Sequence, residues 1–225
     1  MVNVKENLTT IQQQIQAATE KGQQQTEPNV IAVTKYVTME RAKEAYDAGL
    51  RHFGENRVEG FIEKQDKLPD DVTMHFIGSL QSRKLKDVIN QVDYFHGLDR
   101  MKIAKEIDKR ADHTIRCFVQ VNVSGESSKH GIGLSEVNDF IQDLAQYEHI
   151  EVVGLMTMAP LTDDEDYIHQ LFKSLKNKRD EIKALNLTHA PCTELSMGMS
   201  NDFHIAAEEG ASFVRIGTKL VGKEE

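Results

Sequence analysis

Cysteine is scarce in this sequence: its 225 residues contain only Cys117 and Cys192. These two form neither a CxxC pair nor a disulfide framework, which excludes a thiolate metal site and indicates a reducing compartment. Long hydrophobic runs are also absent. No apolar stretch approaches the roughly 18 residues of a membrane span, and residues 1–16 lack the apolar region of a secretion signal. These absences predict a cytoplasmic protein that is neither exported nor inserted in a membrane.

An excess of basic residues is missing as well. The chain has 27 lysines and arginines against 36 aspartates and glutamates, giving a formal net charge of −9. Without a basic cluster, a surface that binds nucleic acid or anionic lipid is not expected. The nine histidines are scattered, and no HExxH or EF-hand pattern is present. We therefore predict no metal site.

The composition is that of a globular chain. Hydrophobic residues make up 39% and charged residues 28%, and there are only 4 prolines, which excludes extensive disorder. At roughly 150 residues per domain, the length favours one large domain. Near the N-terminus, apolar residues recur every three or four positions from Val4 to Ala18, which predicts an amphipathic helix ending near Gly22. The polar segment 23–27 reads as a connector.

After the connector, short β-rich runs alternate with longer helical stretches. The predicted strands are Val30–Thr34, Arg51–Gly54, Thr73–Ile77, Tyr94–His96, Thr114–Val123, Glu151–Met156, Thr193–Ser196 and Ser212–Ile216. Helical patterns lie between them at about 38–48, 56–67, 81–91, 99–112, 135–146, 164–185 and 201–209. Eight βα repeats predict an α/β fold of the TIM (β/α)8 barrel class, preceded by the extra N-terminal helix.

This fold defines the expected domain organisation. We predict a single domain over 1–225, with 1–29 as N-terminal helix and connector and 30–222 as barrel. The alternative is an open doubly wound sheet. That fold carries a glycine-rich turn after its first strand, whereas here the first strand continues into Lys35, Tyr36 and Val37. The barrel is therefore favoured.

Active sites of TIM barrels lie at the carboxyl ends of the strands, which directs attention to Lys35. This lysine directly follows the apolar run VIAVT. A lysine that forms a Schiff base must be neutral to attack a carbonyl, and burial against neighbouring strands favours the neutral form. We expect such partial desolvation at Lys35. The alternative is a lysine that simply leaves a strand for solvent.

Two later strand exits carry residues suited to an anion. Residues 196–200, SMGMS, follow the seventh predicted strand and lead into a helix expected to begin near Asn201. The eighth strand ends in Arg215 and Ile216, followed by Gly217 and Thr218. Free backbone N–H groups at a helix start bind anions, and TIM barrels commonly hold phosphate with their last two βα loops. Together these loops predict a phosphate site, although each could also serve only as a cap or a turn.

A third group of polar residues follows the second and third strands. Asn56 ends the segment HFGEN and could donate a hydrogen bond to a ligand oxygen. His52 and His75 more often occur as hydrogen-bonded core or rim histidines than as acids or bases. We assign no catalytic residue to this group.

Six segments in this order resemble the YggS/PROSC-type family of pyridoxal phosphate homeostasis proteins. They are AVTK at Ala32–Lys35, FGEN at Phe53–Asn56, HFIGxLQ at His75–Gln81, GLM at Gly154–Met156, SMGMS at Ser196–Ser200 and RIGT at Arg215–Thr218. The resemblance covers Val30–Gly222. It implies a single barrel similar to the N-terminal domain of alanine racemase, carrying pyridoxal 5′-phosphate (PLP) as its cofactor.

The resemblance also implies roles for individual residues. Lys35 would hold the cofactor as an aldimine, and Arg215 would face the pyridine nitrogen. Ser200, Gly217 and Thr218 would hold the phosphate, Asn56 would lie near the ring, and Met199 and Ser196 would belong to the pocket. Some members have a second lysine where this chain has Val37. If a lysine passes the cofactor onward here, Lys84 or Lys129 is the candidate.

We expect a cofactor carrier more than an enzyme. Racemisation needs acid–base groups on both faces of the cofactor, and Lys35 supplies only one. Arg215 donates a hydrogen bond and leaves the pyridine nitrogen unprotonated, which weakens the electron sink. A PLP-dependent racemase or related enzyme using Tyr36 or a second chain, and a Schiff-base aldolase without cofactor, remain as alternatives. The expected function is PLP homeostasis by buffering or by delivery to apoenzymes, and the expected state is a monomer.

Overall fold

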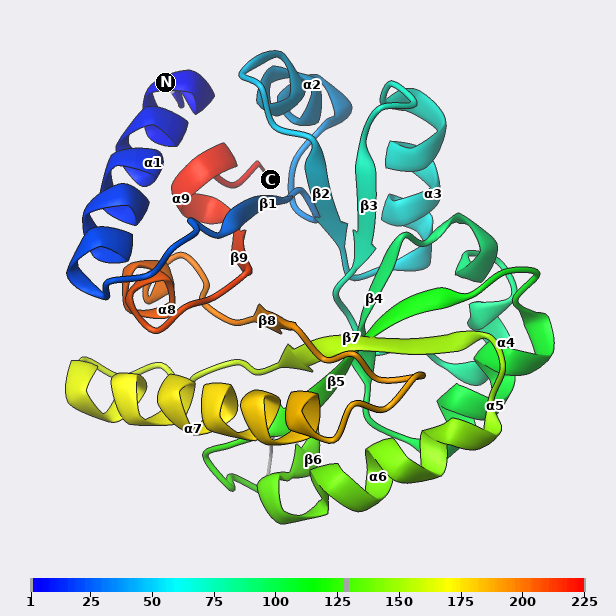
Figure 1. Ribbon diagram of the computed structural model, residues 1–225. Helices are drawn as coiled ribbons and strands as arrows, with labels where there is room; N and C mark the ends of the chain where they lie inside the picture. Colours follow the sequence, from blue (N-terminus) through cyan, green and yellow to red (C-terminus); the bar gives the residue numbers. More distant parts are fainter. Residues whose placement is uncertain (1, 128–129, 225) are drawn as a thin grey trace.

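Eight parallel strands close into a barrel in the computed structural model, which describes residues 2–127 and 130–224 (Figure 1). The strands are β1 (Asn29–Val33), β2 (His52–Glu55), β3 (Thr73–Phe76), β4 (Tyr94–Leu98), β5 (Ile115–Asn122), β7 (Ile150–Met156), β8 (Glu194–Ser196) and β9 (Phe213–Ile216). They follow the order β4-β3-β2-β1-β9-β8-β7-β5, and pairing of β4 with β5 closes the ring. The predicted fold class is confirmed.

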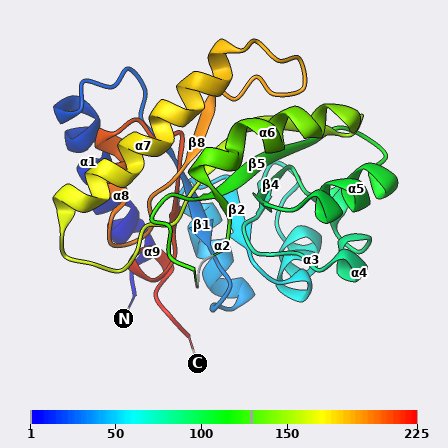
Figure 2. The ribbon, with the colours of Figure 1, turned by 90° about the horizontal axis from the view of Figure 1, so that it is seen from below.

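Helices surround this barrel (Figure 1). They are α1 (Val4–Lys21), α2 (Met39–Asp47), α3 (Val58–Lys67), α4 (Ser82–Leu85), α5 (Met101–Arg110), α6 (Val137–Asp143), α7 (Glu165–Ala184), α8 (Phe203–Glu208) and α9 (Thr218–Val221). Helix α1 begins where the Asn3 side chain accepts a hydrogen bond from the N–H of Glu6, and it buries the predicted apolar face. That face packs against α8 and α9 (Figure 2).

The strands bury both of their faces, as parallel strands in a barrel must. One face packs against the helices: Phe53, Phe76 and Phe95 point outward from three adjacent strands, and the Phe76 ring lies 5.9 Å from that of Phe61 on α3. The other face fills the barrel. There, Phe118 and Phe213 join Ile31, Val153 and Met156 in a smaller apolar cluster. Three histidines, His52, His75 and His96, share this interior with them.

Two predicted helices differ in detail. Residues 81–91 form the short α4 and a separate 3-10 turn, Ile89–Gln91, because i to i+3 hydrogen bonds from Asp87 and Val88 tighten the chain between them. Residues 135–146 likewise divide into α6 with a 3-10 turn at each end. Two elements were not predicted: the two-residue strand β6 (Ile132–Gly133), which pairs with β5 outside the ring, and helix α9. Both are too short to show a periodic pattern.

No helix among the described residues combines the length and apolar composition required to cross a bilayer.

Candidate functional site

A cavity of about 480 Å³ opens at the carboxyl ends of the barrel strands. Seven of the eight residues predicted for the site line it: Lys35, Asn56, Met199, Ser200, Arg215, Gly217 and Thr218. They come from loops that follow β1, β2, β8 and β9, and from β9 itself. The eighth, Ser196, is fully buried and contacts Arg215 from behind the cavity wall. The structure therefore brings residues from both ends of the sequence into one pocket.

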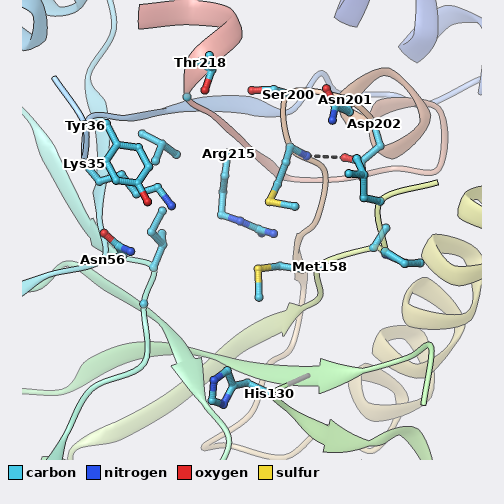
Figure 3. Close-up of a pocket in the computed structure, with 18 of the residues that line it drawn as sticks. Lys35, Tyr36, Asn56, His130, Met158, Ser200, Asn201, Asp202, Arg215 and Thr218 are labelled. Atoms are coloured by element: carbon cyan, nitrogen blue, oxygen red, sulfur yellow. Dashed lines mark hydrogen bonds between the residues drawn. The ribbon is translucent and has the colours of Figure 1, made fainter. Parts of the chain in front are cut away.

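Lys35 lies two residues beyond the end of β1, in a turn. Figure 3 shows its amine directed into the pocket, on the side where Asn56 lies. The Lys35 Nζ also lies 4.8 Å from the centroid of the Tyr36 ring. The expected desolvation is not found, because Lys35 is an exposed residue. The strand ends at Val33, so the lysine rises above the level at which neighbouring strands could cover it.

Asn56 follows β2 and carries an orphaned polar atom. Its Oδ1 is buried and has no hydrogen-bond partner among the described residues. Gly78 packs directly on Asn56: a Cβ built on Gly78 would lie 2.6 Å from the Asn56 carbonyl oxygen. A buried acceptor without a partner costs about 1–3 kcal/mol. Because Asn56 lines the pocket and Gly78 restricts its position, its unpaired Oδ1 is suited to accept a hydrogen bond from a ligand.

The loop after β8 is shaped by Asp202, which the sequence analysis did not identify. Its carboxylate accepts a hydrogen bond of 2.6 Å from the N–H of Met199, and burial raises the pKa of this carboxyl group. Helix α8 begins at Phe203 rather than near Asn201, because residues 200–202 form the turn that this contact closes. Within the described chain, the N–H groups of Ser200 and Asn201 donate no hydrogen bond. They remain available to an anion.

The loop after β9 lies against the first. The N–H of Arg215 donates to the carbonyl of Gly198 at 2.9 Å, which ties the two strand exits together. Gly217 precedes α9, and the amides of Gly217 and Thr218 donate no hydrogen bond to any described residue. Ser200 and Thr218 lie on the same side of the pocket in Figure 3. The two loops therefore meet as predicted, and their binding of an anion stays a prediction.

Arg215 lies between these loops and the Lys35 side of the pocket (Figure 3). It is only 4% exposed, and burial lowers the pKa of its guanidinium to about 10. Its Nη2 donates to the carbonyl of Thr157 at 2.9 Å, and its Nη1 donates to Ser196 Oγ. None of the ion pairs between described residues includes Arg215, although the charge of Asp202 raises its pKa against the larger effect of burial. Two of its five N–H groups are thereby fixed, which orients the guanidinium plane.

A buried hydrogen bond involves Thr34, the residue that precedes Lys35. The Thr34 hydroxyl donates to the carboxylate of Glu55, whose pKa is raised by burial. Lys64 is buried as well, and its Nζ donates to the carbonyl of Val37 at 3.4 Å. These contacts anchor the turn that carries Lys35.

The candidates for a second lysine lie elsewhere. Lys84 pairs with Glu59 at 2.9 Å on the surface and does not line the pocket. Lys129 lies outside the described residues. Tyr36, which the sequence analysis names only as the acid of an alternative enzyme, also lines the pocket. Sequence reasoning missed other lining residues, among them His130 and Met158. Met158 could have been found, because it lies two residues beyond the end of β7.

The donor set fits a phosphorylated pyridine aldehyde. Unpaired amides and hydroxyls at one end of the pocket suit a phosphate, the Arg215 guanidinium suits a ring nitrogen that accepts, and the Lys35 amine suits an aldehyde. No group of three or more histidine, cysteine, aspartate or glutamate side chains among the described residues could hold a metal ion.

Comparisons with known proteins support the same reading. The model of the alanine racemase N-terminal domain family matches residues 6–225. A pyridoxal phosphate homeostasis protein from Aquifex aeolicus is 36% identical over 100% of both chains. PipY from Synechococcus elongatus, solved with PLP bound, is 31% identical with a TM-score of 0.82, covering 97% of this chain and 100% of its own.

More distant structures share the fold. An alanine racemase from Clostridium difficile has a TM-score of 0.77 at 16% identity and matches 97% of this chain, but only 56% of the racemase is covered. The family match and the full-length identity above 30% are consistent with the six sequence segments. This chain therefore belongs to the family of pyridoxal phosphate homeostasis proteins, within the larger alanine racemase N-terminal domain family.

Proposed function

We propose that this protein binds PLP reversibly through Lys35 and takes part in PLP homeostasis, without catalytic turnover. One observation carries the proposal: a single 480 Å³ cavity gathers the Lys35 amine, the Arg215 guanidinium and two loops with unpaired amides. When bound, PLP supplies an aldehyde that a neutral amine can attack to form a Schiff base, with loss of one water. The PLP carried by PipY supports the assignment of the ligand.

Different residues of this chain bind different parts of the ligand. The amides and hydroxyls of Ser200 and Thr218, with the amide of Gly217, bind the phosphate dianion. Arg215 donates to the ring nitrogen from a direction fixed by its bonds to Ser196 and Thr157. The orphaned oxygen of Asn56 accepts a hydrogen bond near the ring, directly or through water.

The same geometry supports a carrier over an enzyme. Arg215 is a donor that pairs with no carboxylate among the described residues. It therefore does not deliver a proton to the ring nitrogen, and carbanions on the cofactor gain less stabilisation. A PLP-dependent racemase stays as the second candidate, because two further proton-carrying side chains line the pocket: Tyr36 beside Lys35 and His130 across the pocket from it (Figure 3). Delivery to apoenzymes, a monomeric state and a cytoplasmic location complete the proposal. The two buried, unpaired cysteines suit a reducing compartment.

An absorption experiment tests the ligand and its attachment. The purified protein is mixed with PLP, and its visible spectrum is recorded before and after borohydride, beside Lys35→Ala. Lys84→Ala is the matched control, since it removes an amine that pairs with Glu59 outside the pocket. The wild type and Lys84→Ala should gain a band that borohydride abolishes, with the cofactor retained on the protein. The same band in Lys35→Ala would refute attachment at Lys35.

A second experiment separates carrier from enzyme. The PLP-loaded protein is incubated with L-alanine in deuterated solvent, and exchange of the α-proton is followed by NMR. A carrier should exchange no faster than free PLP at the same concentration. Exchange at enzymatic rates that is lost in Tyr36→Phe would favour the racemase instead.

A further inference from the structure

Three histidines form a hydrogen-bonded chain through the barrel interior, and it ends at Arg215. His52 Nδ1 lies 2.9 Å from His75 Nε2, and His75 Nδ1 lies 2.9 Å from His96 Nε2. His96 Nδ1 lies 2.8 Å from Ser196 Oγ, to which Arg215 donates. His75 and His96 are fully buried, whereas His52 is partly exposed at the start of β2. We call His52, His75 and His96 the histidine chain.

The strand register explains why these residues meet. His52 pairs with Thr73 and Gly54 pairs with His75, so each histidine lies one step farther along the barrel than the one on the preceding strand. His75 in turn pairs with Tyr94, which places His96 one inward-facing position higher. The histidine chain therefore climbs from the amino-terminal end of the barrel toward the pocket. The expectation that His52 and His75 are hydrogen-bonded rim and core residues is confirmed.

The direction of the hydrogen bonds follows from Ser196. Arginine has no acceptor, so Arg215 must donate to Ser196 Oγ. The Ser196 proton then needs an acceptor, and the described residues offer it only His96 Nδ1. A buried hydroxyl without an acceptor costs about 1–3 kcal/mol. Ser196 therefore donates to His96 Nδ1.

The same logic passes along the histidine chain. A neutral His96 that accepts at Nδ1 carries its proton on Nε2, and it donates to His75 Nδ1. His75 then donates from Nε2 to His52 Nδ1. Every member is neutral, with its proton on Nε2. Each contact holds a single proton, so all of them must reverse together if one reverses.

We propose that Ser196 and the histidine chain are positioning residues for Arg215, acting as a directional relay in which every bond points away from the guanidinium. With the hydrogen bonds in this direction, Ser196 Oγ accepts from Arg215, and His96 carries no positive charge near the guanidinium. An added proton at His52 would reverse the bonds, turn His96 into a donor toward Ser196 and leave the Ser196 proton without a partner. The orientation of Arg215 is thereby coupled to the far end of the barrel.

The surrounding groups support a neutral histidine chain. Burial lowers the pKa of His75 and His96 well below the usual value, and Arg215 lowers that of His96 further. At the other end of the histidine chain, burial is the largest effect on His52 and lowers its pKa. The charge of Asp93 raises this pKa, and that of Arg116 lowers it. Aromatic rings cover the imidazoles: Tyr94 stacks on His75 at 4.8 Å, and Phe118 stacks on His96 at 4.4 Å. Glu151 and Glu194 act on Tyr94 at the same end.

Nitrogen NMR of the histidines tests this relay without any cofactor, so its outcome is independent of the proposed function. Long-range proton–nitrogen correlation spectra of the 15N-histidine-labelled protein at pH 7.5 should show all three imidazoles as neutral Nε2–H tautomers. Ser196→Ala should move the His96 Nδ1 resonance toward that of a free imidazole nitrogen, with smaller shifts at His75 and His52. Ser196→Thr keeps the hydroxyl and should restore the wild-type pattern.

A second pair of variants probes the exposed end. His52→Gln supplies an acceptor for His75 and should keep the tautomers, whereas His52→Leu removes that acceptor and should populate the Nδ1–H forms of His75 and His96 together. Purely structural roles would change stability but not this pattern. A proton on Nδ1 of any chain member in the wild type, or tautomers that ignore both Ser196→Ala and His52→Leu, would overturn the relay.

Discussion

Mild acid should destabilise this fold through His75 and His96. Both are fully buried, and desolvation is the main reason that their pKa values fall well below 6.5. The unfolded chain binds protons at these histidines as the pH falls through 6.5, whereas the folded chain does not. Stability from a base with a depressed pKa is therefore present at neutral pH and is lost on acidification.

The size of the loss follows from proton linkage. Between pH 7.5 and 5.5, each histidine that stays neutral in the folded state costs about 1.4 kcal/mol of unfolding free energy, or about 3 kcal/mol for the two. Glu55 and Asp202 act in the opposite direction, since burial raises their pKa values and acidification relieves their charge. The value of 3 kcal/mol is thus the contribution of His75 and His96 alone, and it is large beside a typical stability of about 5–15 kcal/mol.

Urea denaturation at the two pH values measures this loss. The wild type should lose about 1.4 kcal/mol more stability than His75→Gln, in which one of the two fully buried imidazoles is gone. His113→Gln is the matched control, because it replaces an exposed histidine and leaves both buried imidazoles in place. Equal losses in the wild type and His75→Gln would refute the reasoning, as would a wild type no less stable at pH 5.5.

Three further predictions concern single positions. Glu55→Gln keeps an acceptor for Thr34 and removes a carboxyl group whose pKa is raised by burial. It should therefore raise the melting temperature at pH 8 but not at pH 4, and a lower melting temperature at pH 8 would contradict this. Asn56→Leu removes an unpaired buried oxygen and should stabilise the ligand-free protein by about 1 kcal/mol in urea while weakening PLP binding in a fluorescence titration; unchanged PLP binding would exclude Asn56 from the site. Gly154→Ala brings a Cβ within 2.1 Å of the Glu194 carbonyl oxygen and should cost at least about 3 kcal/mol by calorimetry, whereas Gly217→Ala, whose nearest contact is 3.5 Å, should fold normally.

The sequence predicts the barrel well because a βα repeat leaves a periodic signal in every strand and helix. Strand exits then locate Lys35 and Thr218 without knowledge of tertiary structure. The sequence does not predict which side chains face the barrel interior where both faces of a strand are buried. Periodicity shows that His75 alternates with Phe76, but only the strand register decides which side chain faces the barrel interior. The role of Ser196 depends on that choice.

Asp202 illustrates a different limit. Its carboxylate replaces an expected helix start by closing a turn on Met199, and such short polar contacts leave no repeating pattern. Helix α4 and the following 3-10 turn were merged in the prediction for the same reason, since a switch from i+4 to i+3 hydrogen bonding does not change which residues are apolar.

The seam between β1 and β9, where Ala32 aligns with Ile216, has a consequence for synthesis. Lys35 leaves the ribosome about 180 residues before Thr218, so the two halves of the pocket are made at different times during translation. A nascent chain therefore has no complete pocket until strand β9 docks. A ligand that binds only the closed barrel stabilises this final docking step, because binding to the native state alone shifts the folding equilibrium toward it.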